Sequence, residues 1–225
     1  DYELGGMLLP YVVEAAADTP PSITVRVCQS LTCAMFGSAK LQSDLLARLS
    51  PGARVIPAAC VGRCAAAPVA VVGQNPIEHA SAEVVCTAVG KQSAAAPEHA
   101  AQEFAAYCQG GGYQLLQRCH GGQLTREQVI AALKESRLRG LGGAGFPAGT
   151  KWEILRKQAQ PRLLAINIDE GEPGTFKDRH YLERDPHRFL EGALIAAWVI
   201  ETEDVYIYLR DEYAACRATL NREIA

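Results

Sequence analysis

The sequence lacks both a strong net charge and a long apolar run. Its formal net charge is −3, and lysine and arginine are nowhere clustered, so electrostatic attraction to nucleic acid is not expected. The longest near-pure apolar stretch, 193–200, is far shorter than the roughly 20 residues that cross a bilayer, so no membrane span is predicted. Because the chain begins at Asp1, we expect the natural N-terminus to lie upstream, and the lack of a signal peptide does not decide targeting.

Cysteine, by contrast, is plentiful. Eight cysteines occur in 225 residues, and four of them form two close pairs, Cys28 with Cys33 and Cys60 with Cys64. Secreted disulfide-rich proteins tend to be shorter, with cysteines spaced along the whole chain. The pairs are more typical of a metal or cluster site in a reducing compartment, so a cytoplasmic protein is predicted. The remaining cysteines are expected to be ordinary core or surface residues.

The first part of the chain alternates between strand and helix patterns. Residues 23–27 alternate apolar and polar side chains, as a half-buried strand does, and leucines recur at helical spacing over 41–49. Five elements are predicted in the order β-α-β-β-α, at 23–27, 38–49, 54–56, 68–72 and 80–89. This order is typical of a small open sheet with helices packed on it. Residues 1–22 show no clear period, and no element is predicted there.

The second part begins with a well-marked helix. Thr125 and Gln128 have the spacing of a capping box, and Asp185-Pro186 is a typical helix start for a later helix. The predicted elements are a helix over 125–138, a short helix from Lys151, a strand at 163–166, a helix over 185–200, a strand at 205–209 and a helix from Glu212. Since the last helix has no stop signal, we expect the fold to continue beyond Ala225.

These patterns predict an α/β protein with two domains. The first is placed at 1–92 and the second, truncated, at 123–225. The segment 93–122 is predicted to be a linker because of its alanine run, Pro97 and the Gly110-Gly-Gly112 triplet, although its first residues could also end a helix.

The two cysteine pairs have the spacing C-x4-C, 26 residues, C-x3-C, and each pair follows a predicted strand. Four thiolates can hold a 2Fe–2S cluster, whose irons prefer soft anionic ligands. Small neighbours such as Gly62 leave room for a cluster. A structural zinc site and two disulfides are the alternatives, but zinc sites more often use C-x2-C pairs, and disulfides need an oxidising compartment.

The sequences Val27-Cys-Gln-Ser-Leu-Thr-Cys-Ala-Met-Phe-Gly37 and Cys60-Val-Gly-Arg-Cys64 resemble the thioredoxin-like 2Fe–2S ferredoxin domain. That domain occurs in respiratory complex I and in NAD-linked formate dehydrogenases and hydrogenases. The resemblance covers about residues 23–90. It implies that Cys28, Cys33, Cys60 and Cys64 are all ligands of a 2Fe–2S cluster.

A glycine-rich loop, Gly140-Leu-Gly142-Gly-Ala-Gly145, satisfies G-x-G-x-x-G, but it follows a predicted helix rather than the strand that a Rossmann fingerprint requires. Absent side chains still let backbone N–H groups approach a phosphate or a flat ring. Phe146 could stack on a planar ligand, and Lys151 could offer a positive charge. A mobile surface loop with a solvated lysine is the alternative.

An acidic turn follows the strand at 163–166, with Asn167, Asp169, Glu170 and Glu172 close together. Loops at strand ends are where α/β proteins place ligand-binding groups, and carboxylates accept hydrogen bonds from sugar hydroxyls. An exposed acidic turn is the alternative, and metal binding is a minor one because no histidine lies nearby.

Three segments together closely resemble the NADH-binding flavoprotein subunit of complex I and its relatives: Arg139–Pro147, Lys151-Trp152 and Asn167–Arg179. The resemblance covers 124–225. The flavin contacts that it implies are Gly140, Gly142, Gly143, Lys151, Asn167, Asp169 and Glu170. It also implies that Phe146 stacks on NAD and that Glu172 binds the dinucleotide. Leu141 departs from the family, which commonly has arginine there, so another group would have to replace that arginine.

The fusion of the two domains looks most like the β (diaphorase) subunit of a molybdenum- or tungsten-dependent NAD-linked formate dehydrogenase. The diaphorase subunit of an NAD-reducing hydrogenase is the close alternative. The resemblance implies hydride exchange between FMN and NAD(H), single-electron exchange with iron–sulfur clusters, a catalytic partner subunit, and a 4Fe–4S site in a part beyond this chain. A non-enzymatic electron-relay module and a zinc-stabilised interaction domain are the rivals. No catalytic side chain is predicted, the five histidines are expected to be solvated or structural, and Asp178 and Arg179 are expected to pair with each other.

Overall fold

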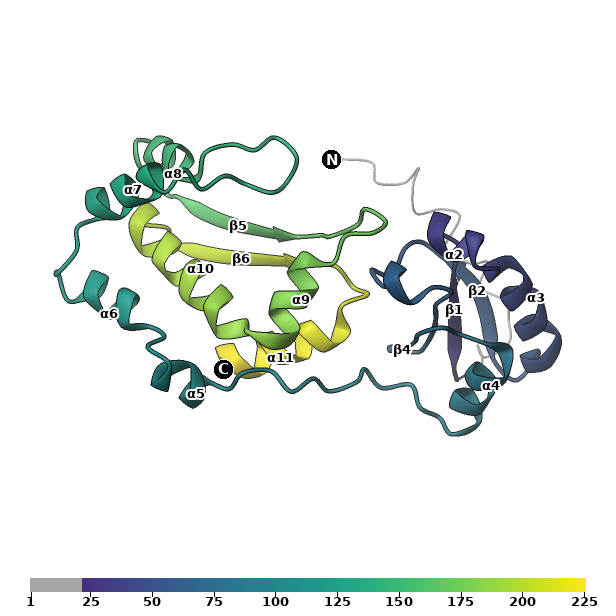
Figure 1. The fold of residues 1–225 in the computed structure, drawn as a ribbon. Coiled ribbons are helices and arrows are strands. Elements are labelled where there is room, and N and C mark those ends of the chain that lie inside the picture. The colour runs from purple at the N-terminus through teal and green to yellow at the C-terminus, as the bar shows by residue number, and fades with distance from the viewer. Residues whose placement is uncertain (1–21) are drawn as a thin grey trace. The chain divides into compact units, whose positions relative to one another are not determined.

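The fold is described from a computed structural model, which describes residues 22–225. Almost all of the N-terminal stretch for which no element is predicted lies outside these residues. The chain forms two compact units, one ending at Ala96 and the other comprising Pro97–Ala225. Figure 1 shows both units as mixtures of helices and strands. Among the described residues, no helix is long and apolar enough to cross a membrane.

The first unit is built on a four-stranded sheet in the order β2-β1-β3-β4. β1 (Thr24–Cys28) pairs in parallel with β2 (Arg54–Ala58), whereas β3 (Ala70–Val72) and β4 (Asn75–Ile77) continue the sheet antiparallel. β4 is an edge strand, where Pro76 costs no ladder hydrogen bond on its open side.

Helices α3 (Ser38–Leu49) and α4 (Ala82–Gly90) pack against this sheet and against each other. Fully buried Val25 and Val27 alternate along β1 and meet Leu45 of α3 and Val85 of α4. The helix α2 (Leu31–Met35) and the 3₁₀ turn η1 (Cys64–Ala66) lie in the loops that follow β1 and β2. The predicted β-α-β-β-α order is therefore confirmed, with α2 and the short strand β4 missing from the prediction.

The second unit contains a two-stranded parallel sheet, β5 (Leu163–Ile168) and β6 (Asp204–Leu209), paired in register along its length. Between them the chain forms α9 (Lys177–Arg184) and α10 (Pro186–Ile200), and after β6 it forms α11 (Ala214–Ile224). These helices cover one face of the sheet.

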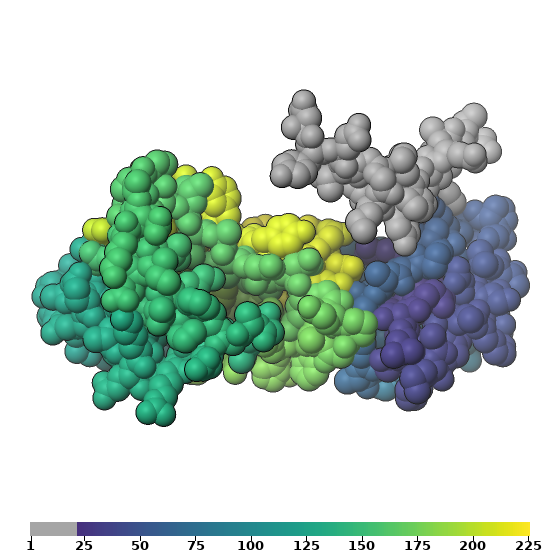
Figure 2. Space-filling view, turned by 90° about the horizontal axis from the view of Figure 1, so that it is seen from above, coloured from purple at the N-terminus to yellow at the C-terminus, as the bar shows by residue number. Residues whose placement is uncertain are grey.

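The core of the second unit lies between this sheet and its helices. Ile168 of β5 packs with Leu182, Leu190 and Leu220, one from each of the three helices. Figure 2 shows the C-terminal segment, in yellow, lying against the lime-green residues of α9. The opposite face of the sheet is open, and Tyr206 and Tyr208 are more than half exposed there.

Four further helices complete this unit: α5 (Phe104–Gln109), α6 (Gln114–His120), α7 (Arg126–Glu135) and α8 (Ala148–Arg156). α5 and α6 contact α10, and α7 packs on α8. Both α5 and α6 fall inside the segment predicted to be a linker, and that domain division stays a prediction.

The helix starts predicted from capping residues are confirmed. Thr125 and Gln128 make both hydrogen bonds of the capping box, and the Asp185 side chain accepts from Arg188 N–H with Pro186 in the first turn. The helix ends were predicted less well, because α7 ends three residues early, before Arg137 takes a left-handed φ of 55°. α9 was not predicted at all.

Gly149 belongs to α8 and not to the loop before it. A Cβ atom there would lie 2.8 Å from the Lys134 backbone nitrogen and 3.1 Å from the Ile130 carbonyl oxygen. The glycine is therefore required for the close approach of α7 and α8, which fixes both ends of the loop between them.

Candidate functional site

The glycine-rich loop between α7 and α8 is closed at its base and open at its tip. Arg139 and Pro147 form a bridge, and Gly140 N–H donates to the Phe146 carbonyl at 2.9 Å. The Arg139 guanidinium donates to the Gly145 carbonyl at 2.9 Å. The loop therefore projects from a narrow, hydrogen-bonded base, and Figure 1 shows it extending in the direction in which β5 runs.

The glycines at the tip face open space. A Cβ atom at Gly142, Gly143 or Gly145 would meet no other atom within 4 Å. Gly143 and Gly145 have φ values of 92° and 60°, which favour glycine, but Gly142 does not lie in that region. Neither packing nor backbone conformation within the chain therefore requires glycine at position 142. The open space at this position leaves room for the close approach of a molecule outside the chain.

The other expected groups of this loop are accessible. Lys151 is exposed in the first turns of α8, Phe146 is 47% exposed, and Leu141 is 78% exposed. The Arg139 guanidinium is held by the loop itself, whereas Lys151 is exposed after the loop. No described contact of Leu141 replaces the arginine that the resemblance leads one to expect.

The acidic turn leaves β5 at the carboxyl end of the sheet. Asn167 and Asp169 are exposed, and the Asn167 side-chain oxygen accepts from Asp169 N–H at 2.8 Å, which fixes the start of the turn. Glu172 is also exposed. Glu170 differs from the others because it is only 5% exposed.

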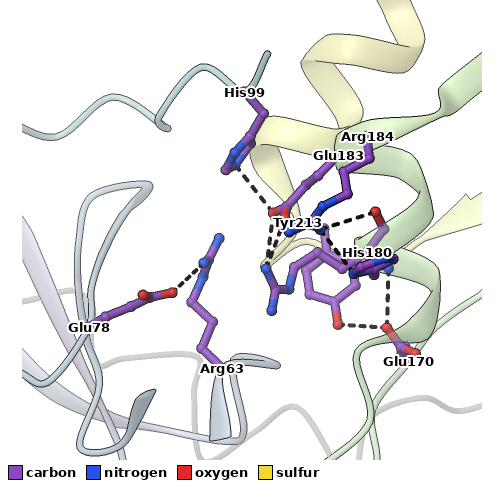
Figure 3. Close-up of polar contacts among 9 residues, drawn as sticks. Arg63, Glu78, His99, Glu170, His180, Glu183, Arg184 and Tyr213 are labelled. Carbon is purple, nitrogen blue, oxygen red and sulfur yellow. Dashed lines mark hydrogen bonds and ion pairs between the residues drawn. The ribbon is translucent and has the colours of Figure 1, made fainter. Parts of the chain in front are cut away.

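The Glu170 carboxylate is occupied by groups of its own chain. It accepts from the backbone N–H groups of Asp178 and Arg179, at 3.1 and 3.4 Å, at the start of α9. Figure 3 shows the Tyr213 hydroxyl pointing at the same carboxylate, with the two oxygens 3.0 Å apart. Burial and the adjacent Glu170 charge raise the pKa of Tyr213, so the hydroxyl remains a donor at neutral pH.

The expected pairing of Asp178 with Arg179 is wrong. Asp178 pairs with Lys177 at 2.7 Å, and Arg179 pairs with Glu183 at 3.0 Å. Residues 179 and 183 are one helical turn apart on α9, a spacing that favours an ion pair. His99 Nε2 lies 3.2 Å from a Glu183 carboxylate oxygen, a pair drawn in Figure 3.

A pocket of about 320 Å³ lies beside the end of β5. Its walls are mostly apolar, and its residues come from β5, α9 and α10; they are Ile166, Asn167, Ile168, Asp178, Tyr181, Leu182, Asp185, Arg188 and Phe189. Asn167 is the one expected site residue in it, and no residue of the glycine-rich loop lines it. The structure thus places the loop and the acidic turn in one unit without closing them into a single pocket.

The four paired cysteines lie at the carboxyl ends of the parallel strands β1 and β2. Cys28 ends β1 and Cys33 lies in α2, while Cys60 follows β2 and Cys64 begins η1. All eight cysteines are free thiols. The paired arrangement predicted from spacing is present, and disulfides are absent from the described residues.

The sulfur atoms form two pairs. The Cys60 and Cys64 Sγ atoms are 3.4 Å apart, and Gly62 N–H donates to Cys60 Sγ at 3.4 Å. Burial, followed by a hydrogen bond with Cys28, raises the pKa of Cys33 to about 12. Over residues 22–225, no three potential ligand side chains converge on a single point. The four thiols therefore form two close pairs, and the two pairs are near enough to interact electrostatically.

Sequence comparison defines the class of the second unit. Residues 133–225 match the family model described as the Nuo51 FMN-binding domain. This segment is therefore similar to the FMN-binding domain of the complex I 51 kDa (NuoF-type) flavoproteins.

Particular relatives support this assignment. The F 2 component of the NADH-quinone oxidoreductase of Rhizobium meliloti (strain 1021) is 47% identical over 120 residues, which are 53% of this chain and 28% of the relative. The corresponding F component of Aquifex aeolicus (strain VF5) is 46% identical over 109 residues, or 48% of this chain and 25% of the relative. The chain thus covers about a quarter of the length of these relatives.

Among solved structures, an NAD⁺-reducing [NiFe]-hydrogenase in the air-oxidised state is similar over both units. The likeness covers 92% of this chain and 41% of that chain, with a TM-score of 0.75 and 27% sequence identity. Most of the fold of this chain therefore has a counterpart in the chain of that enzyme.

Sequence reasoning missed Arg210 and Tyr213. Arg210 directly follows β6, and its guanidinium donates to the Glu170 carbonyl, while Tyr213 reaches the Glu170 carboxylate. The position of Arg210 directly after a predicted strand could have indicated its role, because the carboxyl ends of two parallel strands meet at one edge of a sheet.

Proposed function

We propose that this protein is the NAD-linked electron-transfer (diaphorase) subunit of a larger oxidoreductase. The match of residues 133–225 to the FMN-binding domain family supports a flavin site in the second unit. The observation that carries the proposal is the open tip of the glycine-rich loop, where Gly142 and Gly143 leave space for a ligand. FMN supplies hydride exchange with NAD(H) and one-electron exchange with iron–sulfur centres.

The chain's own groups have distinct tasks in this proposal. The backbone of Gly140, Gly142 and Gly143 lets the ligand approach, and Lys151 offers charge to its phosphate. Asn167 and Asp169, which are exposed at the end of β5, accept from or donate to its hydroxyl-bearing chain. Phe146 and Glu172 are proposed for the dinucleotide, with Phe146 offering an aromatic face.

The first unit is proposed to hold a 2Fe–2S cluster in a thioredoxin-like fold. Each iron of such a cluster takes two protein sulfurs, and the structure offers two pairs, Cys28 with Cys33 and Cys60 with Cys64. The C-x4-C and C-x3-C spacings support iron over zinc, because zinc sites more often use C-x2-C pairs. The Gly62 N–H directed at a sulfur is the kind of donor that tunes a cluster's potential.

A flavin titration tests this function. Full-length protein is expected to bind FMN, and anaerobic NADH is expected to bleach the flavin absorbance near its visible maximum. If purified protein contains iron but takes up no FMN, the enzymatic proposal fails and the electron-relay alternative stands. Zinc without iron in the metal analysis would contradict the cluster.

The partner is proposed to be the catalytic subunit of a molybdenum- or tungsten-dependent formate dehydrogenase, as the sequence resemblance implies. A hydrogenase partner is the second candidate, and the likeness to the NAD⁺-reducing [NiFe]-hydrogenase favours it. Metal analysis of the co-purified complex separates them, because molybdenum or tungsten indicates the first partner and nickel the second.

A further inference from the structure

At the buried end of the acidic turn, the Glu170 carboxylate accepts hydrogen bonds from three groups of its own chain. Glu170 receives two backbone N–H groups of α9 and the Tyr213 hydroxyl. A buried carboxylate is tolerated only when such donors satisfy it, and the start of a helix is a favourable place for a negative charge. This side chain therefore ties the turn to α9 and α11.

Arg210 holds the backbone of the same residue. Its guanidinium donates to the Glu170 carbonyl, and its Nε pairs with Glu212 at 3.0 Å. Arg210 is 7% exposed and lies over the Tyr213 ring, with 5.1 Å between its Cζ atom and the ring centroid. Tyr213 N–H donates back to the Arg210 carbonyl at 3.2 Å. The side chain and the backbone of Glu170 are thus fastened by one compact group after β6.

The alternation of the strand explains which residues remain for a ligand. Successive residues of an extended segment point to opposite faces. Ile168 and Glu170 are buried, whereas Asn167 and Asp169 are exposed. Fixing Glu170 on the inner side therefore also fixes the direction in which Asn167 and Asp169 are presented.

We propose that Arg210 and Tyr213 are positioning residues of the flavin site, and that the Glu170 carboxylate acts on the turn rather than on the cofactor. This inference depends on the proposed function, since it concerns how the turn presents Asn167 and Asp169 to FMN. The resemblance implied a flavin contact for Glu170. In this proposal its side chain instead holds the turn in place, and Asn167 and Asp169 make the contacts with the flavin.

FMN affinity measured by flavin fluorescence quenching tests the inference in the full-length protein. Tyr213→Phe removes one hydrogen bond to a charged group and keeps the ring, so the dissociation constant for FMN is expected to rise about tenfold. Tyr107→Phe is the matched control, because Tyr107 also donates to a buried carboxylate of this unit, Glu191, at 2.6 Å. Both variants should lower the melting temperature, but only Tyr213→Phe should weaken FMN binding.

A double-mutant cycle separates positioning from direct contact. Glu170→Gln and Tyr213→Phe weaken or remove the same hydrogen bond. The FMN affinity of the double variant should therefore be no lower than that of whichever single variant has the lower affinity. Arg210→Lys, which keeps a donor, should retain most of the affinity and the visible circular dichroism of bound FMN, whereas Arg210→Met should lose both.

Several results would overturn the inference. It fails if Tyr213→Phe binds FMN as the wild type does, if Tyr107→Phe weakens binding equally, or if the effects of Glu170→Gln and Tyr213→Phe add. In each of these cases the wild type still binds FMN and the proposed function stands. A wild-type protein that binds no FMN removes the proposed function itself, and this inference with it.

Discussion

Replacing Glu191 by alanine should detach the α5–α6 segment from α10. The Glu191 side chain is 9% exposed and lies on α10, where it accepts from the Tyr107 hydroxyl at 2.6 Å and from Tyr113 N–H at 3.0 Å. Leu116 N–H approaches the other carboxylate oxygen at 3.5 Å. One carboxylate thus joins α10 to both short helices.

The magnitude follows from the groups left without an acceptor. Each buried donor that loses its partner costs about 1–3 kcal/mol. In Glu191→Ala, two strong donors lose their acceptor. Part of this cost is offset because a carboxylate no longer has to be buried. The local opening free energy should therefore fall by about 3 kcal/mol. Tyr107→Phe removes only one partner and should cost about 1 kcal/mol.

Hydrogen exchange is the appropriate assay because it reports local opening rather than unfolding of both units. In Glu191→Ala, amide exchange over 104–120 should speed up by about a hundredfold, and Glu191→Gln, which keeps one acceptor oxygen, should give a smaller effect. Exchange in the first unit should not change. If Glu191→Ala exchanges over 104–120 within threefold of the wild type, the carboxylate is not the anchor that its geometry indicates.

Three further predictions concern pH, packing and the cluster. Burial and nearby carboxylates raise the pKa of Tyr107, Tyr113 and Tyr213, so these hydroxyls ionise more readily in the unfolded chain. Stability is then intact below about pH 10 and falls as pH rises above it, and the urea midpoint between pH 9 and 11 should fall less in Tyr213→Phe. Gly149→Ala should lower the free energy of unfolding by about 1–3 kcal/mol, because its Cβ would crowd the backbone of α7; an unchanged denaturation midpoint would contradict the tight α7–α8 contact. Cys60→Ser should abolish iron binding by the first unit whereas Cys86→Ser, in α4 and outside the pairs, should not; equal iron content in both variants would exclude the proposed ligand set.

Elements with local signals were predictable from the sequence. The capping box at Thr125 and the Asp185-Pro186 start gave two helices correctly, and the alternation at 205–209 gave β6. α9 was missed because its sequence, Lys-Asp-Arg-His-Tyr-Leu-Glu-Arg, is mostly charged and has one buried apolar anchor, Leu182. Its stability comes from the Glu170 cap and from packing, which no local pattern records.

The candidate site was predictable in residue type but not in orientation. The sequence places four polar side chains at the end of one strand, and three of them are exposed as a binding site requires. The inward direction of Glu170 depends on Tyr213, 43 residues further along the chain. Likewise, the role of Gly149 could not be read from the sequence, because it is set by contact with a preceding helix.

The candidate cluster site and the candidate flavin site both lie at the carboxyl ends of two paired parallel strands. β1 and β2 deliver the thiols, and β5 and β6 deliver the acidic turn and its support. In each case most of the candidate ligand groups lie in the loops that follow the strands, whereas the strands themselves supply much of the core. Loop exchange between homologues could therefore alter cofactor preference while leaving the scaffold's folding energetics largely intact.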